Sequence, residues 1–349
     1  MRLEPKPAPS LAGVILYPLA ALAVTMAVAA LLVLAAGASP FAVFYLVARG
    51  AAGSQFALFE TLTRATPLIF TGLAVAVAFR ARLWNIGAEA QLYAGAVVTV
   101  VLGTGALPLP GVVLIPLTML AAMLAGALLL AGPALLKVRF GVDEVVTTLL
   151  LNFIVLLFVS MLLDGPLKDP MGLGWPQSPK VISAAQLPRL VTGKRLHFGF
   201  VIAIAAAAVV WAVMKRATLG YEMRAVGHNR EAAGFAGIPV NAVLMKTALL
   251  SGGIAALAGF SEVAGLKGNL TLDLSPGFGY TGIVVAMLAM LNPLGVVLAA
   301  IFVAGIFVGA DAMSRSTGVP SYIADVMVAT ALLSMVTALL FTRYRLVWR

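Results

Sequence analysis

The sequence predicts an all-α fold, a polytopic membrane helix bundle of about ten transmembrane helices. Hydrophobic residues make up 62% of the 349 residues and charged residues only 10%, and the mean hydropathy is +1.06. Soluble domains carry about 25% charged residues, so this composition excludes an ordinary soluble protein. The apolar runs are long and lack strand-like alternation, which favours helices over a β-barrel as the spanning elements.

Ten apolar segments follow one another along the chain. They cover residues 11–36, 60–79, 87–102, 110–135, 142–163, 198–214, 242–262, 277–291, 294–310 and 322–341. The first is too long and too apolar for a cleavable signal peptide, so we expect it to be the first span. An even number of spans places both termini on one side of the membrane. That side carries 14 Lys and Arg residues against 9 on the other, which predicts that both termini are cytoplasmic.

Two of the ten segments are too short to cross a bilayer. Segment 87–102 has 16 residues and segment 277–291 has 15, so each reaches only about 22–24 Å at 1.5 Å per residue. Residues that break helices bound both: Asn85-Ile86-Gly87 precedes the first segment, Pro276-Gly277-Phe278-Gly279 precedes the second, and Asn292-Pro293 follows it. Broken helices at corresponding places in two halves are typical of transporters, so we predict an inverted repeat with the substrate near its interface. The alternative is that glycine and proline merely kink ordinary spans.

Four polar residues in or next to the apolar segments are candidates for a substrate path. Asn85, Glu89 and Gln91 lie at the first break, and Asn152 lies in segment 142–163. A carboxylate at the centre of the membrane costs roughly 2.5–3.5 kcal/mol, so something must compensate Glu89. Glu89 could instead pair with Arg82 at the membrane surface or cap a helix. Asn152 could instead form a hydrogen bond between helices.

Nothing in the sequence predicts a catalytic, metal or cofactor site. The chain has no cysteine, and its two histidines do not form an HExxH pattern. No serine lies in a G-x-S-x-G motif, and no P-loop is present, so any ATP would be bound by another subunit. The net charge of +10 comes from cations that flank spans. We therefore expect contact with membrane lipid and no binding of nucleic acid.

Residues 216–240 form a hydrophilic island in this apolar chain. The segment is rich in charge and glycine and follows a span on the predicted cytoplasmic side. It is long enough for one or two short helices outside the membrane, which predicts a docking element. A simple solvated connector is the alternative.

Four blocks of sequence resemble one family of membrane proteins. The run LGYEMRAVGHNREAAGFAGI, Leu219–Ile238, resembles the cytoplasmic coupling region of permease subunits of bacterial ABC importers for simple sugars, nucleosides and branched-chain amino acids. Three further blocks are similar to the nucleoside and simple-sugar branch: Glu60–Ala96, Asp143–Ile154 and Leu162–Pro170. The chain departs from the family pattern at Ala90, where we expect glycine, and at Asp143, where asparagine is common.

The resemblance implies a non-catalytic permease subunit in the bacterial cytoplasmic membrane. Its expected partners are an ABC ATP-binding subunit, a second permease subunit and an extracytoplasmic substrate-binding protein or lipoprotein. Closure of the ATPase pair would push on the coupling region and rock the membrane halves around a central path. The residues expected to take part in this coupling are Gly220, Glu222, Arg224, Gly227, Asn229, Glu231, Ala232, Ala233 and Gly237.

The resemblance also implies that residues 1–349 form a single transmembrane permease domain. Residues 164–197 form an extracytoplasmic loop with five prolines, a semi-rigid platform for the binding protein. The expected cargo is a nucleoside or a simple sugar. Alternatives that the sequence leaves open are an ABC permease for branched-chain amino acids, a secondary transporter, and a channel or membrane scaffold.

Overall fold

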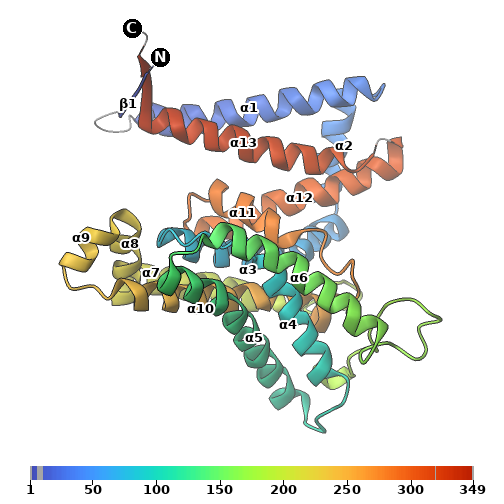
Figure 1. Cartoon of the computed structure of the whole chain (residues 1–349). Helices are drawn as coiled ribbons and strands as arrows, with labels where there is room; N and C mark the ends of the chain where they lie inside the picture. Colours follow the sequence, from blue (N-terminus) through green and yellow to red (C-terminus); the bar gives the residue numbers. More distant parts are fainter. Residues whose placement is uncertain (1, 6–10, 319, 348–349) are drawn as a thin grey trace. The chain divides into compact units, whose positions relative to one another are not determined.

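The computed structural model describes residues 2–5, 11–318 and 320–347, and these are mainly helical (Figure 1). The chain divides into two compact units. One unit combines residues 1–61 with residues 302–349, and the other comprises residues 62–301. Two helices cross the division, namely α3 (Gln55–Arg80) and α12 (Pro293–Thr317).

The first unit joins both ends of the chain. Helix α1 (Leu11–Ala35) packs against α13 (Ile323–Arg343), and the strands β1 (Arg2–Pro5) and β2 (Tyr344–Val347) pair antiparallel. The amino-terminal strand and the strand near the carboxyl terminus therefore lie side by side.

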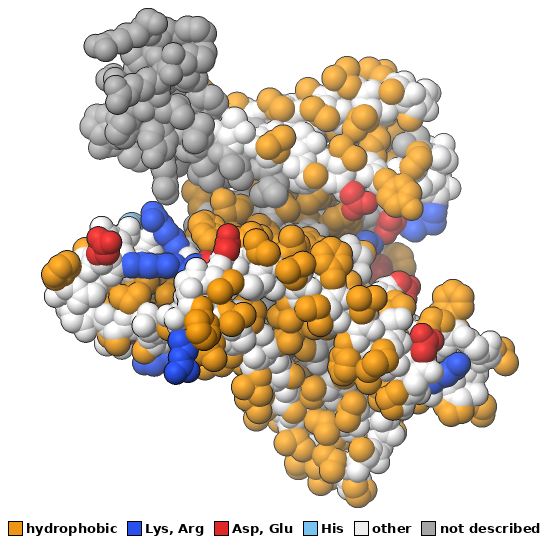
Figure 2. Space-filling view, in the orientation of Figure 1, with side chains coloured by type: hydrophobic (Ala, Val, Ile, Leu, Met, Phe, Trp, Pro, Cys, Tyr) orange, Lys and Arg blue, Asp and Glu red, His pale blue; other side chains and the backbone are white. Residues whose placement is uncertain are grey.

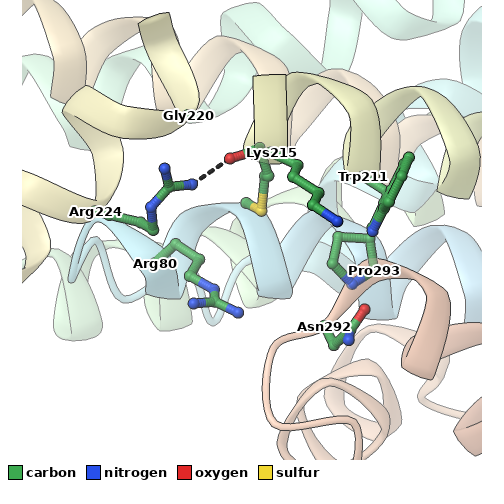
Figure 3. A pocket seen from close by; sticks show the side chains of 8 residues that line it. Arg80, Trp211, Lys215, Gly220, Arg224, Asn292 and Pro293 are labelled. Carbon is green, nitrogen blue, oxygen red and sulfur yellow. Dashed lines mark hydrogen bonds between the residues drawn. The ribbon is translucent and has the colours of Figure 1, made fainter. Parts of the chain in front are cut away.

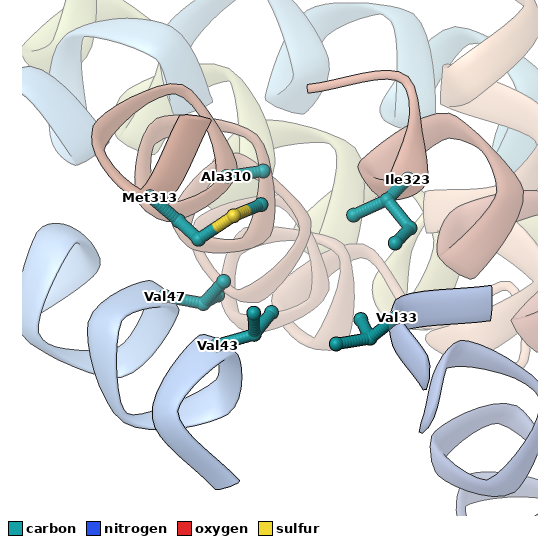
Figure 4. Close-up of a cluster of buried hydrophobic side chains, with 6 residues drawn as sticks. All are labelled: Val33, Val43, Val47, Ala310, Met313 and Ile323. Atoms are coloured by element: carbon teal, nitrogen blue, oxygen red, sulfur yellow. The ribbon is translucent and has the colours of Figure 1, made fainter. Parts of the chain in front are cut away.

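Helix α2 (Pro40–Ala52) completes this unit and is absent from the sequence prediction. The chain turns by 114° between α1 and α2, with Gly37 at φ 76° and Pro40 at the start of the new helix. Proline is favoured there because the first turn of a helix needs no amide donor. A buried apolar cluster then joins α1, α2, α12 and α13 (Figure 4); it consists of Val33, Val43, Val47, Ala310, Met313 and Ile323.

The second unit is built around α3, α4 (Ala88–Gly103) and α10 (Val240–Ser261). The apolar part of α3 is 89% buried and that of the span containing α10 is 78% buried, so these helices form the interior of the unit. Glycines bring the backbones together: a Cβ on Gly259 would overlap the carbonyl of Leu92 in α4, and one on Gly252 would overlap that of Gly126 in α5 (Gly111–Phe140). Small residues at such crossings are typical of membrane helices.

Three long helices cover this interior: α5 (Gly111–Phe140), α6 (Glu144–Asp164) and α7 (Gly199–Arg216). Their apolar parts are only 22%, 22% and 28% buried, and Figure 2 shows hydrophobic side chains over the outer surfaces of α5 and α6. Side chains such as Leu124 and Leu157 are 59% and 72% exposed. Apolar helices with apolar outer faces are what a lipid environment favours.

Every predicted apolar segment corresponds to a helix, and these helices differ in length. Within the described residues, six helices are long and apolar enough to cross, or seven if the bent pair of α1 and α2 is one span. Segment 87–102 becomes the short helix α4, while segment 277–291 shrinks to the eleven residues of α11 (Phe278–Leu288). Ten crossings and an inverted repeat stay predictions.

The hydrophilic island folds into two short helices, as predicted. Helix α8 (Thr218–His228) and helix α9 (Arg230–Phe235) lie between α7 and α10. Residues 262–267 continue α10 as a π-helix, and residues 183–185 form a single 3₁₀ turn in the long loop after α6.

Candidate functional site

The two short helices α4 and α11 meet at their amino termini. The backbone amide of Gly279 in α11 donates to Glu89 Oε2 at 2.6 Å, and a Cβ on Gly279 would overlap the backbone of Glu89. Glu89 lies in the first turn of α4 and is 3% exposed. Its carboxylate is thus close to the positive ends of two helix dipoles, which explains how the unit holds a buried acid here.

Asn85 holds the break before α4 in place. Its side-chain amide and that of Gln91 exchange two hydrogen bonds of 2.9 Å, and its Nδ2 also donates to Ser251 Oγ at 3.0 Å. Ser251 in α10 donates in turn to the carbonyl of Ala74 in α3 at 2.7 Å. Both amide side chains are completely buried. This network therefore connects the loop before α4 to α3 and α10.

Asn152 connects α6 to both short helices. Its Oδ1 accepts from the backbone amide of Ala90 at 2.9 Å, one of the amides that the first turn of α4 leaves unpaired. Its Nδ2 donates to the carbonyl of Ile86 and to the hydroxyl of Tyr280, each at 3.0 Å. All of its polar groups are thus used within the protein.

The four residues predicted to line a substrate path therefore lie together, around the junction of α4 and α11. In this conformation they are buried and hydrogen-bonded to protein groups, so they brace the junction. Contact with substrate stays a prediction. The sequence prediction missed their partners Ser251 and Tyr280. It located the break at residues 276–279, but not the pairing of Gly279 with Glu89.

An ion pair between α5 and α6 holds the neighbouring residue of the same loop, Trp84. Lys137 in α5 and Glu144 in α6 form a salt bridge, and Glu144 Oε1 also accepts from the backbone amide of Trp84 at 3.1 Å. Asp143 begins α6 by accepting from the amide of Val145 at 2.8 Å, so aspartate serves as the helix cap at this position. Residues between α3 and α4 are thus held on both sides.

Helix α8 packs its backbone directly onto the end of α3. A Cβ on Gly227 would overlap the carbonyl oxygen of Arg80, the last residue of α3. A Cβ on Gly220 would overlap the backbone of Val213 and Met214 at the end of α7, and Arg224 donates to the carbonyl of Met214. The helix is therefore anchored on two membrane helices and is no free connector.

Helix α9 is attached at its beginning and projects beyond that point. Asn229 accepts from the amide of Ala232 at 3.0 Å and so caps α9, while Arg230 donates to the carbonyl of Arg82 at 3.0 Å. Each of the two helices exposes one large aromatic side chain: Tyr221 in α8 at 62% and Phe235 at the end of α9 at 95%.

The predicted coupling residues differ in how exposed they are to solvent. Gly220, Gly227 and Ala233 are buried, and Glu222 and Arg224 are half-buried. The exposed members are Asn229, Glu231, Ala232 and Gly237. Gly237 takes φ 80°, a left-handed conformation that favours glycine, and so permits the turn from α9 into α10.

The long loop after α6 is tied to the body of the second unit by backbone hydrogen bonds. The amides of Ser178, Val181 and Leu187 donate to the carbonyls of Leu270, Gly268 and Ala264 at 2.9, 2.8 and 2.8 Å. His197 ends the loop and is fully buried. At the loop's tip three large apolar side chains are exposed: Met171 at 87%, Leu173 at 102% and Trp175 at 67%.

Comparison with known proteins shows that the chain is similar to several transport permeases. The chain is 39% identical to the glucose ABC transporter permease protein TsgB13 of Haloferax volcanii over 82% of its own length and 77% of the relative's. It is 37% identical to the guanosine ABC transporter permease protein NupP of Bacillus subtilis, over 78% of this chain and 79% of that protein. The nucleoside ABC transporter permease protein NupB of Lactococcus lactis is 31% identical over 77% and 76%.

No solved structure matches the chain. The family model described as branched-chain amino acid transport system / permease component matches residues 57–344, which include the α4–α11 junction and helices α8 and α9. The chain therefore belongs to this family of transport permeases.

Proposed function

We propose that this protein is the transmembrane permease subunit of an ATP-driven ABC importer and that it translocates a nucleoside or a simple sugar. The relatives most similar to it among those described above are named as permeases for glucose and for guanosine. The observation that carries the mechanism is the contact of α8 with the end of α3. This contact connects α8, which lies outside the apolar helices, directly to one of those helices.

Helices α8 and α9 receive the ATP-binding subunit. The backbone of Gly227 packs on that of Arg80, and the side chain of Arg230 donates to the carbonyl of Arg82, so a push on the exposed face moves the end of α3. Tyr221 and Phe235 supply the aromatic anchors that protein interfaces use most. ATP hydrolysis belongs to that partner, and this subunit has no catalytic role.

The opposite face receives an extracytoplasmic binding protein. The loop of residues 165–198 is held by backbone hydrogen bonds and presents Met171, Leu173 and Trp175. Exposed apolar groups on a fixed loop are suited to contact with another protein. A second permease subunit, identical or related, completes the path.

The protein resides in the bacterial cytoplasmic membrane with both termini in the cytoplasm and about ten crossings. The pairing of β1 with β2 supports termini on one side. The order of elements supports an inverted repeat: a long helix, a short helix and two long helices follow one another as α3–α6 and again as α10–α13. The junction of α4 and α11 is then the interface of the two repeats.

The cargo passes beside this junction when the two short helices separate. Asn85, Glu89, Gln91 and Asn152 then exchange protein partners for substrate, and three of the four are neutral amides. A nucleoside or sugar is neutral and rich in hydroxyl groups, so amides match it better than a cluster of cations, which an anionic substrate would need.

Transport of a branched-chain amino acid is the second candidate, because the family is described by that activity. Uptake of labelled guanosine, uridine, glucose and leucine by a strain lacking this gene, with and without a plasmid copy, separates the two. We expect the copy to restore guanosine, uridine or glucose uptake. Restoration of leucine uptake alone would refute the proposed cargo.

A further inference from the structure

A pocket of about 180 Å³ lies where α3, α7 and α8 meet the loop before α12 (Figure 3). Three of its lining residues are cations, and each comes from a different helix: Arg80 from α3, Lys215 from α7 and Arg224 from α8. Among the described residues, no carboxylate lines it. The remaining lining residues are Trp211, Met214, Gly220, Asn292 and Pro293.

The positive charges are held in place by neutral groups. Arg80 Nη2 donates to the carbonyl of Leu291 at 3.2 Å, and Arg224 donates to the carbonyl of Met214. Lys215 Nζ lies 5.0 Å from the centre of the Trp211 ring, close enough for a cation–π contact. Carbonyls and a ring orient the cations without cancelling their charge. The pocket therefore favours an anion.

The position of the pocket indicates which anion. Arg80 ends α3, and Lys215 and Arg216 end α7, so the pocket lies at the level where two apolar helices stop. Trp211 is of the residue type that concentrates at the boundary between membrane and water. Basic pockets between helices at this level suit the head group of an anionic lipid, and arginine pairs well with phosphate oxygens.

We propose that this pocket binds a phosphate group, supplied by the head group of an anionic phospholipid. This inference goes beyond the proposed function, because no step of transport requires it. A phosphate there would bridge α8 to α3 and α7 and would add a charged contact to the backbone contact of Gly227.

Native mass spectrometry of the full chain tests the proposal. The protein is purified in neutral detergent, incubated with phosphatidylglycerol or phosphatidylcholine, and the bound lipids are counted. Lys215→Gln is the informative variant. Arg80 and Arg224 donate hydrogen bonds to backbone carbonyls, so their loss would also disturb the fold, whereas Lys215 contributes its charge without such a bond. Arg216→Gln is the matched control: its guanidinium lies 5.8 Å from the same ring, but Arg216 does not line the pocket.

We expect phosphatidylglycerol to bind and phosphatidylcholine not to bind. Lys215→Gln should lower retention of phosphatidylglycerol about fivefold, the effect of one cation near an anionic surface. Lys215→Glu should lower it further, while Arg216→Gln should retain it. Equal retention in all of the variants would overturn the proposal.

A second arm separates lipid from soluble phosphate. In phosphatidylcholine nanodiscs, the reaction of Lys215 with an amine-directed reagent is followed with and without millimolar inorganic phosphate. No protection by phosphate, together with protection in phosphatidylglycerol nanodiscs, supports the lipid as the source. Protection by inorganic phosphate without retention of phosphatidylglycerol would overturn the lipid assignment.

Discussion

The backbone of Gly227 in α8 lies directly against the carbonyl of Arg80, the last residue of α3. Residues 81–87 alone separate Arg80 from α4, and within them Asn85 is tied to α10 through Ser251. Arg80 also contacts the carbonyl of Leu291, beyond the end of α11. We therefore expect a displacement of α8 to reach both short helices through a few directly contacting groups.

Replacing Gly227 should uncouple transport from ATP hydrolysis. In Gly227→Ala the new Cβ overlaps the carbonyl of Arg80, so α8 must move away from α3. We expect ATP-dependent uptake to fall at least about tenfold, the effect of a misplaced contact of roughly 1.4 kcal/mol or more. Copurification with the ATPase should persist, because Tyr221 and Phe235 are unchanged.

Gly234→Ala in α9 is the matched control for that substitution. The nearest atom to a Cβ there is Val240 Cγ2 at 4.0 Å, so the methyl group fits. Uptake should be that of the parent protein. If both glycine variants transport equally well, the contact of α8 with α3 does not carry the coupling.

Removing the Asn152 amide should loosen the junction of the short helices. Asn152→Leu leaves the amide of Ala90 and the carbonyl of Ile86 without their partner in a buried place. Each unpaired group costs about 1–3 kcal/mol, so the apparent Tm should fall and uptake should decrease. The neighbouring Phe153 is 57% exposed on the outer face of α6, so Phe153→Leu should leave both unchanged.

Two substitutions of Glu89 distinguish a structural acid from an ion-coupling acid. In Glu89→Gln the side-chain oxygen can still accept from the amide of Gly279, whereas Glu89→Leu leaves that amide unpaired. We expect Gln to preserve most uptake and Leu to reduce it about tenfold or more. Abolition of uptake by Gln would instead indicate that the charge is required, as in a secondary transporter.

Acidification should open the end of the long loop. His197 is buried outside the apolar spans, and its burial lowers the imidazole pKa from 6.5 to about 4. Its Nδ1 accepts from the amide of Gly199 at 3.2 Å, which requires the neutral ring. An opened loop takes up a proton near pH 6.5, so the closed form loses stability as pH falls from about 6.5 to 4 and is insensitive to pH above that range.

Hydrogen exchange of residues 187–199, corrected for intrinsic rates, measures this opening. In the parent protein, the free energy needed to open the loop should fall by on the order of 3 kcal/mol between about pH 7.5 and 4.5, and protection should fall with it. His197→Gln should remove the pH dependence, whereas His228→Gln, at the exposed end of α8, should retain it. The same pH profile in all three proteins would assign the effect to another group.

Local patterns along the chain predicted most of its helices. Uninterrupted apolar runs and their breaks located the long apolar helices and both short helices, and the charge-rich stretch 216–240 predicted α8 and α9. Helix α2 was missed because its thirteen residues are too few for a span and follow the first apolar run after a turn of four residues.

The partners of the buried polar residues could not be predicted in this way. Asn152 bonds to Tyr280, 128 positions away, and Asn85 bonds to Ser251, 166 positions away. Such pairs depend on how helices pack, which hydropathy and spacing along one segment do not record. The sequence thus located the candidate residues, while the packing decided that they bond to one another.

Site-specific photocrosslinking tests the central claim, that α8 and α9 receive the ATP-binding subunit while the long loop faces the binding protein. A photoreactive phenylalanine derivative replaces Phe235 in one protein and Trp175 in another; both positions are largely exposed, at 95% and 67%. In intact cells, position 235 should crosslink to an ATP-binding subunit and position 175 to an extracytoplasmic binding protein. Crosslinking of the ATPase at position 175, or its absence at position 235 in cells where the complex transports, would contradict the account.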